Sequence, residues 1–368
     1  MATDKASGLD GVVVADTRLS DVDGERGRLI IAGHDVEALA GELPFEAACA
    51  LLEAGVRPDP TRVAYLRRAL GAARVKAHGM VPSLGGALDA ADGMDALRAS
   101  LAHCSAGSDD EQSTFDLIGA VATFAAAWSR RRRGLPPIAP DASRTHAADY
   151  LRMVTGEVPS AAATAALDAY LVTVIDHGMN ASTFAARVVA STGSDLVSAV
   201  VAAIGALKGP LHGGAPGPVL DMLDAIGVAS NASSWLESEL LAGRRIMGMG
   251  HRIYRVRDPR AAVLERAVLR LEQAGQGGDR RRLELARAVE SAATGILRAR
   301  HPQRPLHANV EFYTAILLDA LGLPRELFTP TFAAARVAGW CAHVREQRAV
   351  GRLIRPASRY VGSPATAA

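Results

Sequence analysis

The chain has 368 residues, of which 49% are apolar and only 4% aromatic, so it can hold a large and a smaller domain, and its many alanines favour close helix packing over a β-sandwich. Its 41 basic and 39 acidic residues give a formal charge of +2, which argues against nucleic acid or an anionic membrane as a partner. Three widely spaced cysteines, Cys49, Cys104 and Cys341, favour neither a disulfide framework nor a zinc cluster and suit a reducing compartment.

The N-terminal half predicts a small strand or hairpin followed by helices. Residues 1–27 lack the apolar core of a signal peptide, and no apolar run in the chain is long enough to span a membrane. We therefore expect a cytoplasmic protein. The apolar run RLIIAG at 28–33 predicts the strand. The first helix is predicted to have Pro44 in its first turn, with apolar residues at helical spacing, and to stop at Gly55.

The stretch from 103 to 146 is less regular and predicts a surface excursion. An alanine-rich helix through Trp128 is followed by four arginines, Arg130–Arg133, and then by the proline-rich segment GLPPIAP. Four arginines can bind a phosphate, but a charge run before a proline-rich turn is usually a solvated surface feature. We interpret Arg130–Arg133 in this second way and assign them no site.

The remaining sequence predicts several more helices. Residues 161–207 are interpreted as two helices broken near STGSD at 191–195, the second with one apolar face in the core. Further helices are predicted over 260–274, 281–300, 312–321 and about 330–347. The tail from Gly351 to Gly362 predicts extended chain.

Four short motifs place acids, bases and hydrogen-bond donors beside small residues. They are DHGMNAST from Asp176, GPLHGGAPG at 209–217, GHRIYRVRDPR at 250–260 and NVEFY at 309–313. Glycines beside a histidine let the backbone approach a ligand closely. GPLHGG alone is equally compatible with a glycine-rich turn that carries an incidental histidine. The order of all the motifs along the chain makes the signal specific.

This set resembles the active-site signature of the citrate synthase family, in its short dimeric form. The resemblance implies an all-α, two-domain helical fold. Residues 1–216 and 324–368 would form a large domain with the dimer interface and the oxo-acid site, and residues 217–323 a small acyl-CoA domain. It also implies a reaction, in which acetyl-CoA is deprotonated next to its thioester, attacks oxaloacetate, and yields citrate and CoA after hydrolysis of citryl-CoA. No metal or redox cofactor is expected, because the sequence has no metal-ligand cluster or nucleotide fingerprint.

The resemblance assigns three catalytic residues. His212, in GPLHGG, steadies the enol of the thioester, and His251, in MGMGHRIY, donates to the carbonyl oxygen of the oxo acid. Glu311 stands where the family normally has the aspartate that removes the proton. One extra methylene moves a carboxylate by roughly 1 Å, so the site around Glu311 must be fitted to it. We interpret Glu311 as an adapted base.

Four further residues are implied to bind the oxo acid. His177 belongs to DHGMNAST, in which Gly178 replaces the glutamate of the family's D-H-E-x-N-A-S-T. Arg260, Arg336 and Arg355 match family arginines that hold carboxylates, a task for which the planar guanidinium is suited. In the family the tail arginine reaches the neighbouring subunit's site. The resemblance therefore implies a homodimer in which Arg355 acts in trans.

The implied acyl-CoA site lies around the G-x-G-H loop. Its backbone, at Met247, Gly248, Met249 and Gly250, would cradle the adenine, and Arg255 would contact a phosphate. The phosphate assignment stays open, because Arg252 and Arg257 are equally suitable.

Three alternatives remain open on sequence alone. A 2-methylcitrate synthase would use propionyl-CoA, and one methylene discriminates substrates by only about 1–3 kcal/mol. A catalytically weak paralogue would bind acyl-CoA or a protein through the same cleft, and the retained histidines and arginines argue against it. A helical scaffold without a ligand would carry arbitrary residues at the motif positions.

Overall fold

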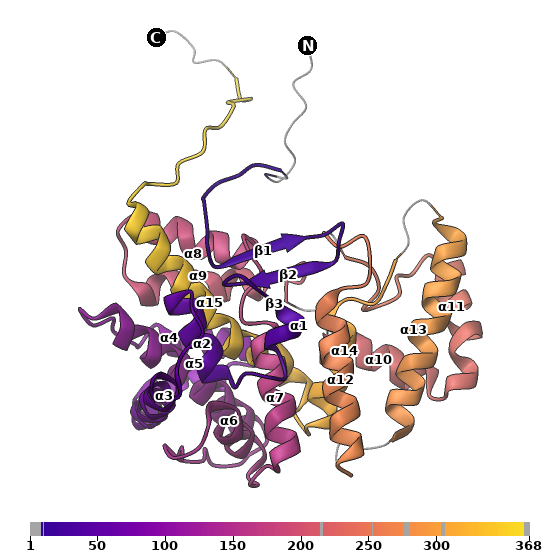
Figure 1. Ribbon diagram of the computed structural model, residues 1–368, viewed down its shortest axis with the longest axis horizontal. Helices are drawn as coiled ribbons and strands as arrows, with labels where there is room; N and C mark the ends of the chain where they lie inside the picture. The colour runs from indigo at the N-terminus through magenta and orange to yellow at the C-terminus, as the bar shows by residue number, and fades with distance from the viewer. Residues whose placement is uncertain are drawn as a thin grey trace.

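Helices make up most of the molecule, and a small sheet lies near its N-terminal end (Figure 1). This computed structural model describes residues 9, 11–213, 216–251, 253–275, 280–302 and 306–363. The predicted all-α class is confirmed. None of the helices within these ranges is long and apolar enough to cross a membrane.

The sheet has three antiparallel strands in the order β1-β2-β3, namely β1 Ser20–Asp23, β2 Arg28–Ile31 and β3 His34–Asp35. The strand predicted at 28–33 is β2, which buries Leu29 and Ile31 and exposes Arg28. Ser20 pairs with Ile31, and its hydroxyl donates to Asp176. The sheet thereby contacts the loop that carries His177.

Most of the helices form one packed group, in which α5 packs against α3, α4, α6 and α15. They are α1 Val36–Leu39, α2 Phe45–Ala54, α3 Pro60–Met80, α4 Gly93–Leu101, α5 Asp110–Arg132, α6 His146–Thr155, α7 Ala161–Thr173, α8 Ala181–Ser191, α9 Leu196–Leu207 and α15 Phe328–Val350. The 3₁₀ segment η2, Val81–Asp89, joins α3 to α4. The first predicted helix is confirmed as α2, with Pro44 as its N-cap instead of in its first turn, and Gly55 ends it with a φ of 73°.

The prediction of a surface excursion over 103–146 is wrong. Helix α5 is a central core helix, with Phe124 and Trp128 almost completely buried. Arg130 is buried as well, and its Nε donates to the Pro136 carbonyl over 2.6 Å. Burial of this charge is possible because loop carbonyls accept its donors. The solvated interpretation holds only for Arg131–Arg133, which are exposed.

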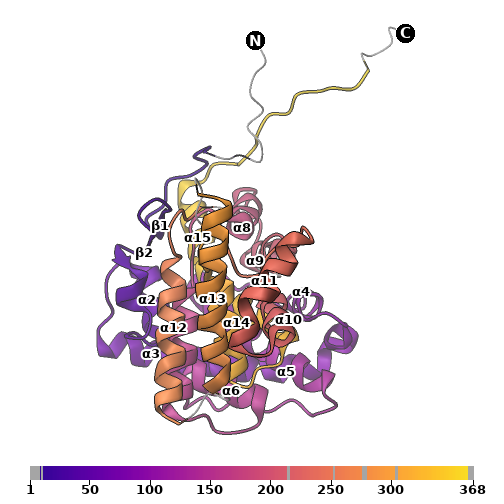
Figure 2. The same cartoon turned by 90° about the vertical axis from the view of Figure 1, so that its right-hand side faces the viewer.

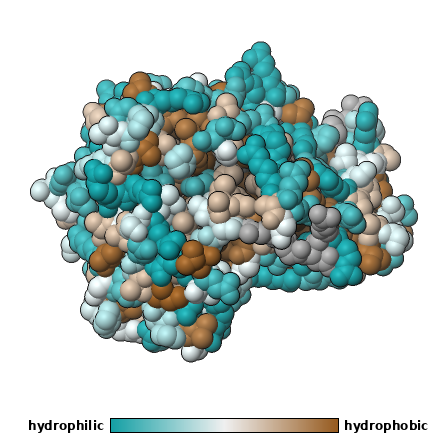
Figure 3. Space-filling model, turned by 60° about the horizontal axis from the view of Figure 1, so that its bottom comes forward, coloured by the Kyte–Doolittle hydropathy of each residue, from teal (hydrophilic) through white to brown (hydrophobic). Residues whose placement is uncertain are grey.

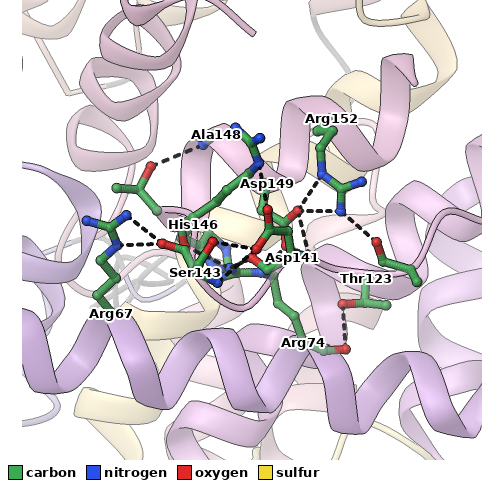
Figure 4. Close-up of polar contacts among 12 residues, drawn as sticks. Arg67, Arg74, Thr123, Asp141, Ser143, His146, Ala148, Asp149 and Arg152 are labelled. Atoms are coloured by element: carbon green, nitrogen blue, oxygen red, sulfur yellow. Dashed lines mark hydrogen bonds and ion pairs between the residues drawn. The ribbon is translucent and has the colours of Figure 1, made fainter. Parts of the chain in front are cut away.

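A buried polar cluster fixes α6 against α3 (Figure 4). The fully buried Arg74 donates from Nε to Asp149 Oδ2 over 2.8 Å, and its NH1 lies 3.3 Å from His146 Nδ1. Arg152 and the Asp141 amide also donate to the Asp149 carboxylate. All these residues lie outside the cavity described below.

The contact between α3 and α5 leaves no room for a side chain at Gly119. A Cβ there would lie 2.6 Å from the Ala73 carbonyl carbon and 2.8 Å from the Arg74 nitrogen, both rigid backbone atoms. We expect Gly119→Ala to destabilise the protein by about 1–3 kcal/mol in urea unfolding. Gly79→Ala, on α3 in open space, should instead stabilise it by about 0.5–1 kcal/mol. Equal effects at both positions would contradict the close packing.

The remaining helices lie side by side on the right of Figure 1 and face the viewer in Figure 2. They are α10 Pro216–Ile226, α11 Ala232–Leu241, α12 Pro259–Gln273, α13 Arg280–Arg300 and α14 Val310–Ala320. Two further 3₁₀ turns are η3, Ala229–Asn231, and η4, Arg325–Leu327. The helices predicted over 260–274 and 281–300 are confirmed. Helix α14 begins two residues before the predicted start, because Asn309 caps it and accepts from the Glu311 amide.

Residues 161–207 form three helices, so the prediction of two is wrong. The break near 191–195 is confirmed, but a second one separates α7 from α8 at 174–180. There Gly178 adopts a φ of 60°, and Asn180 caps α8 by accepting from the Ser182 and Thr183 amides. The apolar run before Asp176 hides this break, which carries His177.

Polar and apolar residues are interspersed on the part of the surface that faces the viewer in Figure 3. On the face shown in Figure 3, apolar residues form separate small areas among hydrophilic ones. Beyond α15, residues 352–361 have no regular secondary structure and run away from the helices (Figure 1). The predicted extended tail is thus confirmed.

Candidate active site

One cavity of about 830 Å³ is lined by residues from distant parts of the chain. Six of the predicted catalytic and oxo-acid residues line it, namely His177, His212, His251, Arg260, Glu311 and Arg336. They come from the α7–α8 loop, the turn after α9, the segment before α12, and helices α12, α14 and α15. The folded chain therefore brings both predicted sets, catalytic and oxo-acid-binding, into one space.

His212 lies against the N-terminus of α8. The Ser182 amide donates to its Nε2 over 3.3 Å, and the Ser182 hydroxyl lies 2.8 Å from the same nitrogen. Because Nε2 accepts, the ring proton of the neutral imidazole resides on Nδ1. Burial, and next the charge of Arg336, lower the pKa of His212 to about 4. His212 is therefore a neutral hydrogen-bond donor near pH 7.

His251 has the opposite tautomer. Its Nδ1 accepts from the amides of Ile253 and Tyr254 over 3.0 and 3.1 Å, so its proton resides on Nε2. Burial and the nearby Arg260 lower its pKa to about 4. The Arg260 NH2 group lies 3.3 Å from the same Nε2. Two donors that converge in this way create a place for an oxygen acceptor of a ligand.

Arg260 is held rigidly by Asp258. The Arg260 Nε and NH2 groups donate to the two Asp258 oxygens over 3.0 and 2.8 Å, and both side chains are buried. Asp258 also caps α12 by accepting from the Arg260 amide, and it accepts from the Val310 amide at the start of α14. Asp258 thus joins the start of α12 to the start of α14 through its ion pair with Arg260 and its hydrogen bond from the Val310 amide.

Glu311 lies in the first turn of α14. Its backbone is fixed by Asn309, whose Nδ2 also donates to the Gly250 carbonyl over 2.8 Å. Burial raises the pKa of Glu311 to about 7, because the loss of hydration outweighs the attraction of Arg260 and Arg336. A carboxylate with such a pKa is well matched to proton abstraction near neutrality.

His177 and Arg336 complete the wall of the cavity. His177 Nε2 lies 3.1 Å from the Tyr254 hydroxyl, and burial followed by Arg260 lowers its pKa well below the usual range. Arg336 donates from Nε to the Val174 carbonyl over 2.7 Å, and its guanidinium lies over the Phe332 ring. Burial lowers the pKa of Arg336 only to about 10, so it stays charged. Two guanidinium groups beside three neutral imidazoles suit a dianion.

Other predicted residues lie elsewhere in this single chain. Arg355 is exposed in the tail and does not line the cavity. Within the predicted adenine loop, Gly248 and Gly250 have φ values of 73° and 86°, and Met249 forms a β-bridge with Ala308. Gly250 lines the cavity. Arg255 is exposed, and its Nε lies 3.8 Å from Glu25 Oε1. Arg252 lies outside the described residues.

Sequence reasoning missed several contributors to the site. Tyr254 contacts the His177 and His251 rings, and its place three residues after His251 in the motif was the available signal. Val12 and Val14 from the N-terminal segment also line the cavity, and no sequence pattern marked them.

Comparison with known proteins identifies consistent relatives. Residues 8–357 match the family described as citrate synthase, C-terminal domain. A 2-methylcitrate synthase of Mycobacterium tuberculosis is 38% identical over 370 residues, which cover 98% of this chain and 91% of that protein. A citrate synthase of Haloferax volcanii is 36% identical over 378 residues, which cover 98% and 97% of the two chains.

Solved structures agree with these sequence matches. The citrate synthase of Thermotoga maritima superposes with a TM-score of 0.84 at 33% identity, covering 98% of this chain and 97% of that one. The citrate synthase of Thermoplasma acidophilum, solved as a ternary complex with carboxymethyl coenzyme A and oxaloacetate, has a TM-score of 0.87 at 25% identity and covers 99% and 98%.

Proposed function

The chain belongs to the citrate synthase family, and on that premise we propose that it condenses acetyl-CoA with oxaloacetate and hydrolyses citryl-CoA to citrate and CoA. The observation that carries this proposal is the shared cavity of Glu311, His212 and His251. In that cavity Glu311 can act as the base, His212 as the donor that stabilises the enol, and His251 as the donor that polarises the ketone. These three roles are what the formation of the carbon-carbon bond requires.

Oxaloacetate binds first in this scheme. Its carboxylates pair with Arg260 and Arg336, and His177 adds a hydrogen bond. Its ketone oxygen occupies the place in front of His251 Nε2, where the converging donors of His251 and Arg260 have an acceptor. The hydrogen bond from His251 makes the ketone carbon electrophilic. The bulky, buried surroundings keep water away from this carbon.

Acetyl-CoA then supplies the nucleophile. Glu311 removes a proton from the methyl carbon, and the charge that develops on the thioester oxygen is met by His212 Nδ1–H. The resulting carbon attacks the ketone, His251 protonates or hydrogen-bonds the new alkoxide, and water cleaves citryl-CoA. We assign the adenine to the backbone of Met247, Gly248, Met249 and Gly250, and a phosphate to Arg255.

A second function is supported by the 38% identical 2-methylcitrate synthase. The two reactions differ by one methyl group on the acyl chain. Release of CoA from acetyl-CoA and from propionyl-CoA, each with oxaloacetate, is measured side by side to decide between them. A higher kcat/KM with acetyl-CoA supports citrate synthase, whereas preference for propionyl-CoA identifies the methyl homologue. No CoA release with either thioester would contradict both.

The pH dependence of this reaction should be governed by Glu311. The base must be ionised, and its pKa is about 7, so kcat/KM should fall about tenfold per pH unit below pH 7. His212 and His251 must be neutral, and with pKa values of about 4 they already are. Initial rates of CoA release between pH 5 and 9 test whether the acidic limb of the kcat/KM profile reflects Glu311. An acidic limb centred near pH 4 would contradict the raised pKa of Glu311.

We also propose an active homodimer in which Arg355 enters the partner's site. Its exposed position on a tail that leaves the helices is compatible with that role (Figure 1). Homodimers of Glu311→Gln and of Arg355→Leu should each be inactive. After subunit exchange, each mixed dimer has one complete site, so a 1:1 mixture should regain about a quarter of wild-type activity. No recovery despite verified exchange would place Arg355 outside the partner's site.

The division into a large domain, 1–216 with 324–368, and a small domain, 217–323, is likewise our proposal. Its support is the arrangement of α10 to α14 beside the other helices (Figure 2). Cavity residues come from both parts, so relative movement of the two would open and close the site.

A further inference from the structure

A buried polar chain lies directly behind the cavity wall that carries His177. It runs from Glu346 through Arg187 and His343 to Asp176, the residue before His177. Arg187, His343 and Asp176 are all completely buried. The catalytic scheme above uses none of these side chains, and none of them lines the cavity.

Arg187 fixes the proton of His343. Its Nε and NH2 groups lie 3.0 and 2.8 Å from His343 Nδ1. A guanidinium can only donate, so Nδ1 accepts and the ring proton must reside on Nε2. His343 Nε2 lies 3.2 and 3.1 Å from the two Asp176 oxygens and therefore donates to them. Gln347 and Glu346 accept two further Arg187 donors, which holds the guanidinium in place.

Strand β1 also holds this loop through hydrogen bonds of Ser20. The Ser20 hydroxyl donates to Asp176 Oδ2 and accepts from the Gly178 amide over 2.8 Å. His177 thus stands between two anchored neighbours. Gly178 itself adopts a φ of 60°, which a residue with a Cβ rarely does, so the loop shape is specified locally as well.

Helix α15 contacts this loop without any intervening space. A Cβ at Gly339 would lie 2.3 Å from the Ile175 carbonyl oxygen and 3.0 Å from Asp176 Oδ1. His343, four residues after Gly339, donates a hydrogen bond to Asp176. Arg336, three residues before Gly339, donates one to the Val174 carbonyl. The loop that presents His177 and the helix that presents Arg336 are therefore joined at two points.

Electrostatics strengthen this connection. Burial alone would raise the pKa of Asp176, but His343, Arg336 and Ser20 outweigh it and bring the pKa to about 2. Asp176 is therefore a permanent buried anion close to Arg336. It offsets part of the charge of that guanidinium before a substrate carboxylate arrives.

We propose that His343, oriented by Arg187, is a positioning residue for the oxo-acid site: by holding Asp176 it fixes the loop that aims His177, together with Arg336, at the substrate carboxylates. This inference rests on the proposed function, which assigns the oxo acid to these side chains. His343 touches no reacting atom. Its effect must therefore appear in oxo-acid binding and not in recognition of the thioester.

The test compares His343→Leu, which fills the space without donor or acceptor, with His343→Gln, whose amide can do both. Oxaloacetate affinity is measured by calorimetry on the full chain, and KM values are measured for both substrates. His343→Leu should weaken oxaloacetate binding and raise its KM about tenfold or more, with the acetyl-CoA KM changed by less than about twofold. His343→Gln should restore most of the affinity.

Ser20→Ala is a milder second variant, because it releases the loop from β1 without altering α15. It should raise the oxaloacetate KM about threefold, and it carries the test if His343→Leu does not fold. A matched control is His146→Leu, which removes another buried histidine beside an arginine, in the cluster of Figure 4. That variant should lower Tm and leave the oxaloacetate KM unchanged.

A double-mutant cycle separates positioning from general loss of packing. If His343 acts through the His177 loop, adding His343→Leu to His177→Ala should weaken oxaloacetate binding less than it does in the wild type. Unchanged oxaloacetate affinity in both His343→Leu and Ser20→Ala, or equal losses in His146→Leu, would overturn the inference alone. Wild-type protein that binds no oxaloacetate would instead overturn the proposed function.

Discussion

Replacement of Glu311 by glutamine is expected to lower kcat by about 10³-fold or more, because an amide cannot accept the proton of the thioester. The substitution keeps the shape of the side chain and its place in the first turn of α14. Arg260, Arg336 and His177 are left intact, so oxaloacetate should bind with an affinity within about threefold of wild type. Initial rates of CoA release and calorimetric titration with oxaloacetate measure the two quantities separately.

Two companion variants make this result specific to the base. Glu326→Gln changes an exposed glutamate and should leave kcat unaltered. Glu311→Asp restores the residue usual in the family but withdraws the carboxylate by one methylene. If the cavity is fitted to glutamate, this variant should lose about 10–100-fold in kcat. A fully active Glu311→Gln enzyme would remove Glu311 from the mechanism.

The largest effect on stability is expected from Asp258→Asn. Asparagine still caps α12, so the change removes mainly the negative charge. Arg260 would then be a buried cation without its bidentate partner, and such a loss costs about 3–5 kcal/mol. Urea unfolding should show this decrease in the free energy of unfolding. The oxaloacetate KM should rise as well, because the guanidinium is no longer held in one orientation.

Asp319→Asn is the matched control for this prediction. Asp319 pairs with Arg282 over 3.4 Å on the surface, where its side chain is 36% exposed. Water screens such a pair, so the expected loss is below about 1 kcal/mol. Similar losses at Asp258 and Asp319 would mean that the buried pair is not an anchor of the site.

The motifs and the family resemblance predicted six catalytic and oxo-acid residues that line one cavity, although these residues are separated by up to 159 positions, from His177 to Arg336. The prediction succeeded because the motifs combine chemically specific side chains with neighbouring glycines or helix-capping residues. Those neighbours set the local backbone conformation in the folded chain. The tautomers of His212 and His251 were not predictable. They depend on which nitrogen faces the amides of Ser182, Ile253 and Tyr254, and that is a property of the packed structure.

Local patterns were least informative where tertiary packing decides. The apolar residues before Asp176 continue a helical pattern, so the end of α7 was missed. Arg130 belongs to a charge run, yet the carbonyls that make its burial possible come from Pro136 and Val154, which only the fold brings near. The partnership of Arg187 with His343 has the same origin, because these residues are 156 positions apart and neither lies in a recognisable motif.

The joint between the α7–α8 loop and α15 also constrains biosynthesis. Asp176 leaves the ribosome long before His343, and at about 5–20 residues per second the delay is roughly ten to thirty seconds. During that interval the nascent chain holds an aspartate destined for the interior without its imidazole partner. We expect chaperones to bind the nascent chain preferentially at this incomplete pocket. Stalled chains that end before α15 should remain susceptible to proteases around residues 174–180.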